Sequence, residues 1–247
     1  MKSTALVLLS LSLTGAVQAA ELSVAVAANF AAPMQKIAAA FEHETGHKLA
    51  LSFGGTGKFY AQIRNGAPFE VLLAADGETP ARLEREGLCV AGTRFTYAIG
   101  KLVLWSRQAD LVDDRGEVLR AAALERIALA DPKLAPYGAA AMQVLRELGL
   151  AEALRGKFVQ GESIGQAYQF VATRNAPLGF VALSQVFVDG RVTEGSAWVV
   201  PEDLYAPIRQ DALILARGKD NPAASELMRY LQGEAAKAVI RAYGYGL

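Results

Sequence analysis

The chain has 247 residues, of which 52% are hydrophobic, so it can bury a substantial core in one large domain or in two lobes. Its 25 basic and 25 acidic residues give a formal net charge of zero and are mixed along the sequence. Without a run of Lys or Arg, we expect no nucleic-acid partner and no patch that attracts a membrane. A single cysteine, Cys89, excludes an intramolecular disulfide.

The first twenty residues have the layout of a secretory signal peptide. Lys2 gives a positive start, ALVLLSLSL (5–13) is mainly apolar, and GAVQAA (15–20) ends in small residues. We therefore predict a signal peptide over residues 1–20, with cleavage after Ala19 or Ala20. A membrane anchor is the alternative, but the apolar run is short for a bilayer span. The mature protein is expected to be exported and soluble.

Strands and amphipathic helices alternate through the first half. LSVAVA (22–27) reads as a strand, and the apolar spacing from Phe30 to Phe41 is that of one helix face. Gly46 is expected to end this helix as a left-handed cap. The next elements are expected as a strand at 49–53, a helix at 59–65, a strand at 69–75 and a helix at 80–86.

The second half has the same alternation. Strands are expected at 102–105, 127–130, 157–160, 178–182 and 212–216. Helices are expected at 138–148, 165–174, 222–231 and 234–242. Such alternation predicts an α/β architecture with mostly parallel sheets.

Four predicted strands run through small or polar residues directly into a helix. These turns contain Asn29, Gly54-Gly55-Thr56-Gly57, Pro136-Tyr137-Gly138 and Ser163-Ile164-Gly165. Ligands of open α/β sheets lie beyond the carboxyl ends of strands, and a helix N-terminus offers unpaired N–H groups and partial positive charge to an anion. Ordinary helix capping is the alternative for each turn by itself. Four such turns, two in each half, favour an anion site, with ordinary capping still open as the alternative.

Two short motifs suggest enzymes. Residues 43–47 read HETGH, which matches the H-E-x-x-H pattern of zinc proteases. Gly46 interrupts the helix that this pattern requires, and the chain has no third histidine, although Glu or Asp could still complete a zinc site. We interpret His43 and His47 as surface residues flanking a helix end, and keep a zinc metallohydrolase as an alternative.

The stretch GGTGK (54–58) suggests a nucleotide-binding P-loop, but its spacing is wrong. Ser52 stands where the motif needs its first glycine, and Phe59 stands where it needs Ser or Thr. We therefore expect no nucleotide at this loop.

The four turns and their flanking segments resemble the periplasmic molybdate-binding proteins of ABC importers, over nearly the whole mature chain. The segments that carry the resemblance are VAVAANF (24–30), LSFGGTGKFYAQIRNGAPFEVLLAAD (51–76), RFTYAIGKLVLWS (94–106), DPKLAPYGAAAMQVLRELGL (131–150), GESIGQA (161–167), NAPLGFVAL (175–183) and the closing RAYGYGL. The resemblance implies an α/β, two-lobe type II periplasmic-binding fold, each lobe a mostly parallel sheet flanked by helices. Two crossing strands would join lobe one, residues 21–99 plus 204–247, to lobe two, residues 100–203.

Carried over position by position, the resemblance implies that the side chains of Asn29 and Thr56 donate to the oxyanion. It also implies backbone N–H donors at Tyr137 and Ile164. Many members of the family donate a tyrosine hydroxyl where this sequence has Ala182. We hypothesise that the Tyr137 side chain replaces that donor.

The ligand implied is molybdate, with tungstate as a second. Molybdate carries no proton at neutral pH and needs only donors, whereas phosphate keeps a proton and would need an acceptor carboxylate. Another tetrahedral oxyanion, such as sulfate, is the alternative. The resemblance implies a periplasmic, monomeric binding protein without cofactor, resident metal or catalytic residues, which delivers its ligand to a permease with its ATPase.

Overall fold

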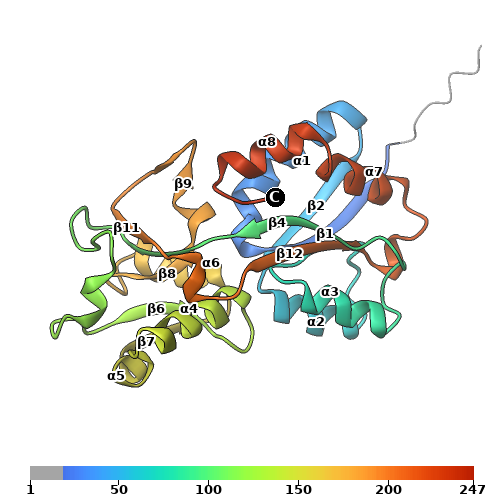
Figure 1. Ribbon diagram of the computed structural model, residues 1–247. Helices are drawn as coiled ribbons and strands as arrows, with labels where there is room; N and C mark the ends of the chain where they lie inside the picture. Colours follow the sequence, from blue (N-terminus) through green and yellow to red (C-terminus); the bar gives the residue numbers. More distant parts are fainter. Residues whose placement is uncertain (1–18) are drawn as a thin grey trace, which may run out of the picture.

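The structure, a computed structural model, describes residues 19–247. The predicted signal peptide, except for Ala19 and Ala20, lies outside these residues. The chain folds into two sheets, each covered by helices, that lie side by side (Figure 1). We call each sheet with its helices the first or the second lobe. No helix within residues 19–247 is long and apolar enough to cross a membrane.

The sheet of the first lobe has the strand order β2-β1-β3-β12-β4. Its strands are β1 (Glu21–Ala27), β2 (Lys48–Gly54), β3 (Val71–Leu73), β4 (Phe95–Gly100) and β12 (Ile208–Ile214). Only β12 runs against its neighbours, and the other four strands share one direction.

The sheet of the second lobe has the order β11-β5-β8-β6-β7. Its strands are β5 (Leu102–Ser106), β6 (Ile127–Ala130), β7 (Phe158–Gly161), β8 (Gly179–Ala182) and β11 (Ser196–Val199). A small hairpin pairs β9 (Phe187–Val188) with β10 (Arg191–Val192). Here β5 is the reversed strand. The predicted α/β fold with mostly parallel sheets is confirmed, and both lobes place one reversed strand next to the parallel ones.

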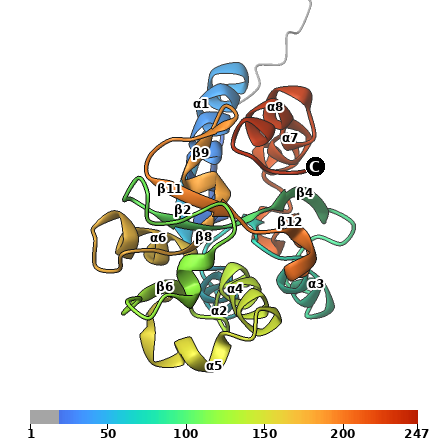
Figure 2. The same cartoon turned by 60° about the vertical axis from the view of Figure 1, so that its left-hand side comes forward.

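Helices cover both faces of each sheet (Figures 1 and 2). In the first lobe, one face is covered by α1 (Ala31–Thr45), α7 (Pro222–Leu231) and α8 (Glu234–Ala242), and the other by α2 (Thr56–Arg64) and α3 (Glu78–Arg85). In the second lobe, α4 (Pro136–Glu147) and α5 (Ala151–Leu154) pack on one face, and α6 (Ile164–Ala172) on the other. Short 3-10 helices are η1 (Ala28–Phe30), η2 (Glu117–Arg120), η3 (Arg155–Lys157), η4 (Leu183–Gln185), η5 (Glu202–Leu204) and η6 (Ala216–Gly218).

The chain crosses between the lobes twice. It leaves the first sheet at Gly100 and enters the second at Leu102, then returns from Val199 to Ile208. The Tyr205 hydroxyl accepts a hydrogen bond from the Leu102 amide at 3.1 Å, which ties the two crossings together. Gly100 lies under the Tyr137 side chain: a Cβ at this position would come within 2.0 Å of the tyrosine hydroxyl oxygen.

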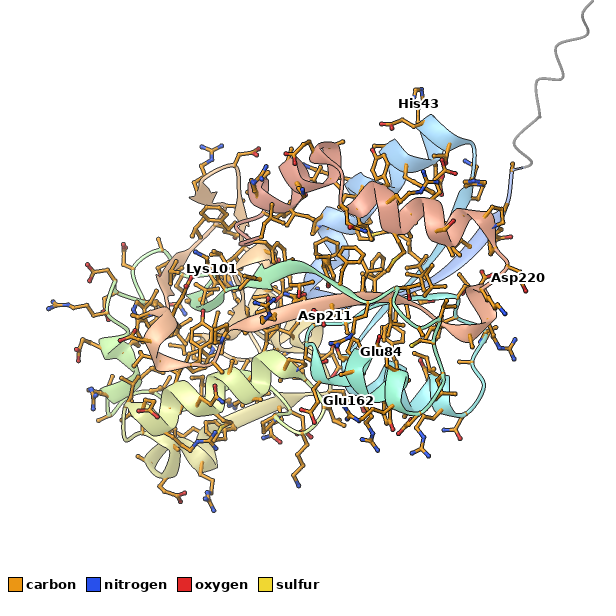
Figure 3. All side chains as sticks on the ribbon, turned by 45° about the vertical axis from the view of Figure 1, so that its right-hand side comes forward. His43, Glu84, Lys101, Glu162, Asp211 and Asp220 are labelled. Carbon is orange, nitrogen blue, oxygen red and sulfur yellow. The ribbon has the colours of Figure 1, made fainter. Side chains whose placement is uncertain are left out.

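The structure corrects the interpretation of the two histidines. Helix α1 ends at Thr45, and Gly46 adopts the predicted left-handed conformation with φ of 75°. His43 is exposed at the outer end of this helix (Figure 3), but His47 is fully buried. The ring of His47 stacks on Phe41, with the ring centroids 6.1 Å apart.

Both ring nitrogens of His47 have partners. Nδ1 accepts a hydrogen bond from the Ala20 amide at 3.0 Å, so Nε2 carries the proton and donates to the Glu226 carboxylate at 3.0 Å. The residue therefore fastens the start of β1 to α7.

We predict that His47→Ala lowers the free energy of unfolding by about 2–4 kcal/mol, because it removes a buried ring and leaves the Ala20 amide without its acceptor. His43→Ala is the matched control and should change it by less than about 0.5 kcal/mol, since the side chain is exposed. Urea denaturation of the three proteins measures both values. Equal losses in the two variants would contradict the structural role of His47.

Candidate functional site: a buried cavity between the lobes

The four predicted turns meet around one small cavity between the lobes. Asn29 and Thr56 reach it from the first lobe, and Tyr137 and Ile164 reach it from the second. All four residues are buried. The rest of the lining consists of small residues from the same turns and Ala75, and no charged side chain is among them. The cavity is small, so it can take only a compact ligand of a few atoms.

Thr56 opens α2, and its hydroxyl is held in place by the first lobe. Its Oγ1 accepts a hydrogen bond from the Ala75 amide at 2.9 Å. A threonine hydroxyl has one proton to donate, and the bond with Ala75 uses only the oxygen as acceptor. The O–H of Thr56 therefore remains available to a ligand in the cavity that this residue lines.

Backbone amides at three helix starts supply further donors. Thr56 is the first residue of α2, Tyr137 the second of α4, and Ile164 the first of α6. For the N–H groups of these three residues, no backbone acceptor exists between residues 19 and 247. The first N–H groups of any helix lack an internal partner, and the helix dipole adds positive potential there. The cavity is therefore suited to an anion without containing a cation.

Behind the cavity lies a buried polar network that joins both lobes to the crossing strand β12. Asn29 donates from Nδ2 to Gln210 Oε1 at 2.8 Å and to the Tyr245 hydroxyl at 2.9 Å. Gln210 in turn donates from Nε2 to the Tyr137 hydroxyl at 3.0 Å. Tyr97 donates to the carbonyl of Ala74 or to Gln210 Oε1, each at 3.0 Å. Sequence reasoning missed Gln210, Tyr97 and Tyr245, because their positions in the chain give no sign that they meet Asn29.

The network carries no formal charge. Burial raises the pKa of Tyr97, Tyr137 and Tyr245 above the usual value for tyrosine, so all three remain protonated at neutral pH. Each can therefore act as an O–H donor. Burial also raises the pKa of Asp76, which follows Ala75 and accepts hydrogen bonds from Thr79. Asp76 lines the neighbouring groove and not the cavity itself.

The structure places the predicted Tyr137 hydroxyl in this network, where it accepts from Gln210. Direct contact between that hydroxyl and a ligand stays a prediction. Ala182, which stands where relatives were expected to have a tyrosine, is buried at the end of β8 and does not line the cavity.

Glycines allow the two lobes to touch around the cavity. The Gly57 amide donates to the carbonyl of Leu134 at 3.1 Å, across the gap between lobes. A Cβ at Gly57 would lie 2.9 Å from that carbonyl oxygen, and a Cβ at Gly55 would lie 3.0 Å from the carbonyl oxygen of Glu162. The Glu162 carboxylate, at the rim between the lobes (Figure 3), lies 3.9 Å from the ammonium of Lys58. The structure is therefore closed around the cavity.

A larger, open groove adjoins the cavity and shares Ala75, Ala135 and Pro136 with it. Its walls are charged, and the pair between Arg94 and Asp211 at 3.1 Å belongs to them. Charged side chains therefore line the groove, whereas the cavity is lined by neutral donors and small residues.

The zinc alternative finds no support. Between residues 19 and 247, no cluster of three or more His, Cys, Asp and Glu side chains could hold a metal ion. His47 uses both ring nitrogens in hydrogen bonds, and His43 points away from the molecule, far from the cavity rim at Glu162 (Figure 3).

Two similar α/β lobes that close on a small donor-lined cavity define a solute-binding protein, in which hinge closure encloses the ligand. The chain belongs to the bacterial extracellular solute-binding protein family, whose model matches residues 22–246.

Its relatives include the molybdate-binding protein ModA of Azotobacter vinelandii, which is 65% identical over 94% of this chain and 92% of the relative. The molybdate-binding protein ModA of Rhodobacter capsulatus is 52% identical over 92% of this chain and 88% of that protein. Among solved structures, a periplasmic molybdate-binding protein of Azotobacter vinelandii superimposes with a TM-score of 0.89 at 42% identity. This match covers 92% of this chain and 99% of the other. All three relatives are binding proteins by name.

We predict that Gly100→Ala lowers the free energy of unfolding by about 1–3 kcal/mol, because its Cβ would overlap the Tyr137 hydroxyl. Adding Tyr137→Phe to this variant should recover part of the loss, since it removes the overlapping oxygen. Denaturant unfolding of the two single variants and the double variant measures the interaction. Simple addition of the two single losses would contradict the close contact.

Proposed function

We propose that this protein binds molybdate, and also tungstate, in the cavity between its lobes. The observation that carries the proposal is the donor set: the hydroxyl of Thr56 and the unpaired amides of Thr56, Tyr137 and Ile164 converge on one buried, uncharged cavity. The names of the closely similar relatives support the same ligand.

The chemistry of the cavity matches a fully deprotonated oxyanion. Molybdate offers only acceptors, and each donor of the cavity can bind one of its oxygens without a competing acceptor carboxylate. Hydrogen phosphate needs an acceptor for its proton, and the nearby carboxylate of Asp76 lies in the groove instead. Sulfate has the right charge, and we propose that the size of the closed cavity decides against it, because the contacts at Gly57 and Gly55 fix how far the lobes can approach.

The same architecture suggests how the ligand is captured and passed on. We propose that lobe one comprises residues 21–99 plus 204–247 and lobe two residues 100–203, that the crossings at Gly100 and near Tyr205 act as the hinge, and that a closed monomer docks on an ABC importer. The permease and its ATPase would then move the ligand, and the binding protein itself would have no catalytic activity and no cofactor.

A periplasmic location follows from the relatives and from the predicted signal peptide over residues 1–20. Both backbone groups of Ala20 are hydrogen-bonded within the fold: its amide donates to His47 Nδ1, and its carbonyl accepts from the Lys48 amide. These contacts favour cleavage after Ala19 over cleavage after Ala20.

Calorimetric titration of ligand-free protein with molybdate, tungstate, sulfate and phosphate tests the proposal. We expect tight one-to-one binding of molybdate and tungstate. The dissociation constants of sulfate and phosphate should be at least about two orders of magnitude higher, because a ligand that fits poorly leaves buried polar groups of the site unpaired. Sulfate binding without a molybdate response would replace the proposed ligand by sulfate.

Thr56→Val should weaken molybdate binding about 10-fold to 100-fold, because it removes a buried donor to a charged ligand while keeping the shape of the side chain. Thr56→Ser keeps the hydroxyl and is the matched control, with an expected change below about threefold. The dissociation constants from calorimetry give the comparison. If valine binds as tightly as serine at this position, the Thr56 hydroxyl is not a ligand donor.

A further inference from the structure

Asn29 has a side-chain atom without a partner. Its Oδ1 is the one buried side-chain nitrogen or oxygen without a hydrogen bond among residues 19–247. Nδ2 of the same carboxamide is engaged by Gln210 and Tyr245. Both atoms diverge from one carbon, so the bonds of Nδ2 turn Oδ1 away from Gln210 and Tyr245. Because Asn29 lines the cavity, we infer that Oδ1 is the atom on the cavity side. A buried acceptor without a donor is unfavourable by itself, and it would also repel an anion.

The hydrogen bonds around Asn29 can be satisfied in a second way. If the carboxamides of Asn29 and Gln210 both exchange their oxygen and nitrogen positions, no heavy atom outside them has to move, because amide oxygen and nitrogen are nearly equal in size. Asn29 Oδ1 then accepts from Gln210 Nε2 and from the Tyr245 hydroxyl, and Nδ2 of Asn29 faces the cavity.

The neighbouring hydroxyls can follow this exchange. Tyr137 changes from acceptor to donor and binds Gln210 Oε1, so in this arrangement its single O–H is used and the ligand receives only the Tyr137 backbone amide. Tyr97 keeps its bond to the Ala74 carbonyl while accepting from Gln210. The carbonyl of Asn29 keeps the hydroxyl of Ser184, at 2.8 Å, as its donor. Every buried donor and acceptor has a partner once an anion accepts from Asn29 Nδ2, and no proton is gained or lost.

We propose that Gln210 is a positioning residue for the ligand site: it sets the orientation of the Asn29 carboxamide, so that Asn29 presents Nδ2 to the oxyanion when the site is loaded. Gln210 does not line the cavity and therefore acts through Asn29. This inference rests on the proposed function, because it names what orients one donor of the same site.

The position of Gln210 makes it responsive to closure. It lies on the crossing strand β12 and is fully buried. Its carboxamide joins Asn29 and Tyr97 of the first lobe to Tyr137 of the second. A Cβ on Gly100, at the other crossing, would approach Gln210 Nε2 to 2.6 Å. The Gln210 carboxamide therefore has all of its partners only when the lobes are closed and Tyr137 lies beside it. This dependence couples the orientation of the Asn29 amide to closure of the lobes.

A double-mutant cycle on molybdate binding tests the assignment. Gln210→Met keeps the length of the side chain but removes its donor and acceptor, and should weaken molybdate binding about tenfold. Asn29→Ala removes the oriented amide and should weaken binding about 10-fold to 100-fold. In the Asn29→Ala background, Gln210→Met should change the dissociation constant by less than about twofold, because the residue through which Gln210 acts is gone.

The outcomes separate this inference from the proposed function. Equal effects of Gln210→Met in both backgrounds, or no effect in either, would overturn the positioning role while molybdate binding by the unmodified protein stands. Failure of the unmodified protein to bind molybdate would overturn both.

A second measurement needs no substitution. In protein labelled with ¹⁵N at asparagine, Asn29 is the one buried asparagine of residues 19–247, and its side-chain amide signal can be followed by NMR. Molybdate should shift the two amide protons of Asn29 as they leave Gln210 and Tyr245 for the anion, and should protect them from exchange with solvent. Unchanged Asn29 amide signals in the molybdate-loaded protein would contradict the exchange.

Discussion

Unpaired backbone N–H groups inside a closed cavity are the constraint on which this structure depends. A helix cannot satisfy its first amides internally, and burial away from water makes each unpaired donor unfavourable. In this protein the starts of α2, α4 and α6 are buried together at the contact between the lobes. An anion that accepts from all of them would remove this penalty and stabilise the closed arrangement. In the proposed complex, the ligand therefore completes the contact between the lobes.

Close approach of the backbones makes this arrangement possible. Gly55 and Gly57 let the turn before α2 lie against the carbonyls of Glu162 and Leu134 in the second lobe. Gly100 leaves room for the Tyr137 hydroxyl at the crossing. The cavity itself contains no charged side chain, and the nearest ion pairs lie in the groove or at the rim. The proposed selectivity thus rests on geometry and on the direction of hydrogen bonds, because a charge in the wall would attract any anion.

Much of the fold could be predicted because local patterns encode it. The alternation of apolar strands and amphipathic helices gave the α/β class, and Gly46 marked the end of α1 correctly. The strand bounds were less accurate where polar residues interrupt the pattern: β12 begins at Ile208, four residues before the predicted start, since Arg209, Gln210 and Asp211 hide its apolar face. The four turns were found because a strand that opens directly into a helix has a recognisable sequence.

The long-range contacts could not be predicted. Asn29 and Gln210 are separated by 181 positions, and their hydrogen bond depends on how β12 crosses between the lobes. His47 was expected at the surface, because nothing in HETGH shows that Ala20 and Glu226 surround its ring. Pattern alone predicts which turns carry donors, whereas the orientation of a side-chain amide depends on partners that only the tertiary structure brings together.

Anomalous diffraction from crystals grown with molybdate tests the central claim most directly, because molybdenum can be located without reference to the protein density. The account predicts one strong molybdenum peak in the cavity, within hydrogen-bonding reach, through its oxygens, of the Thr56 hydroxyl and of the Tyr137 and Ile164 amides. A peak beside the charged groups of the open groove, with the cavity left empty, would contradict it.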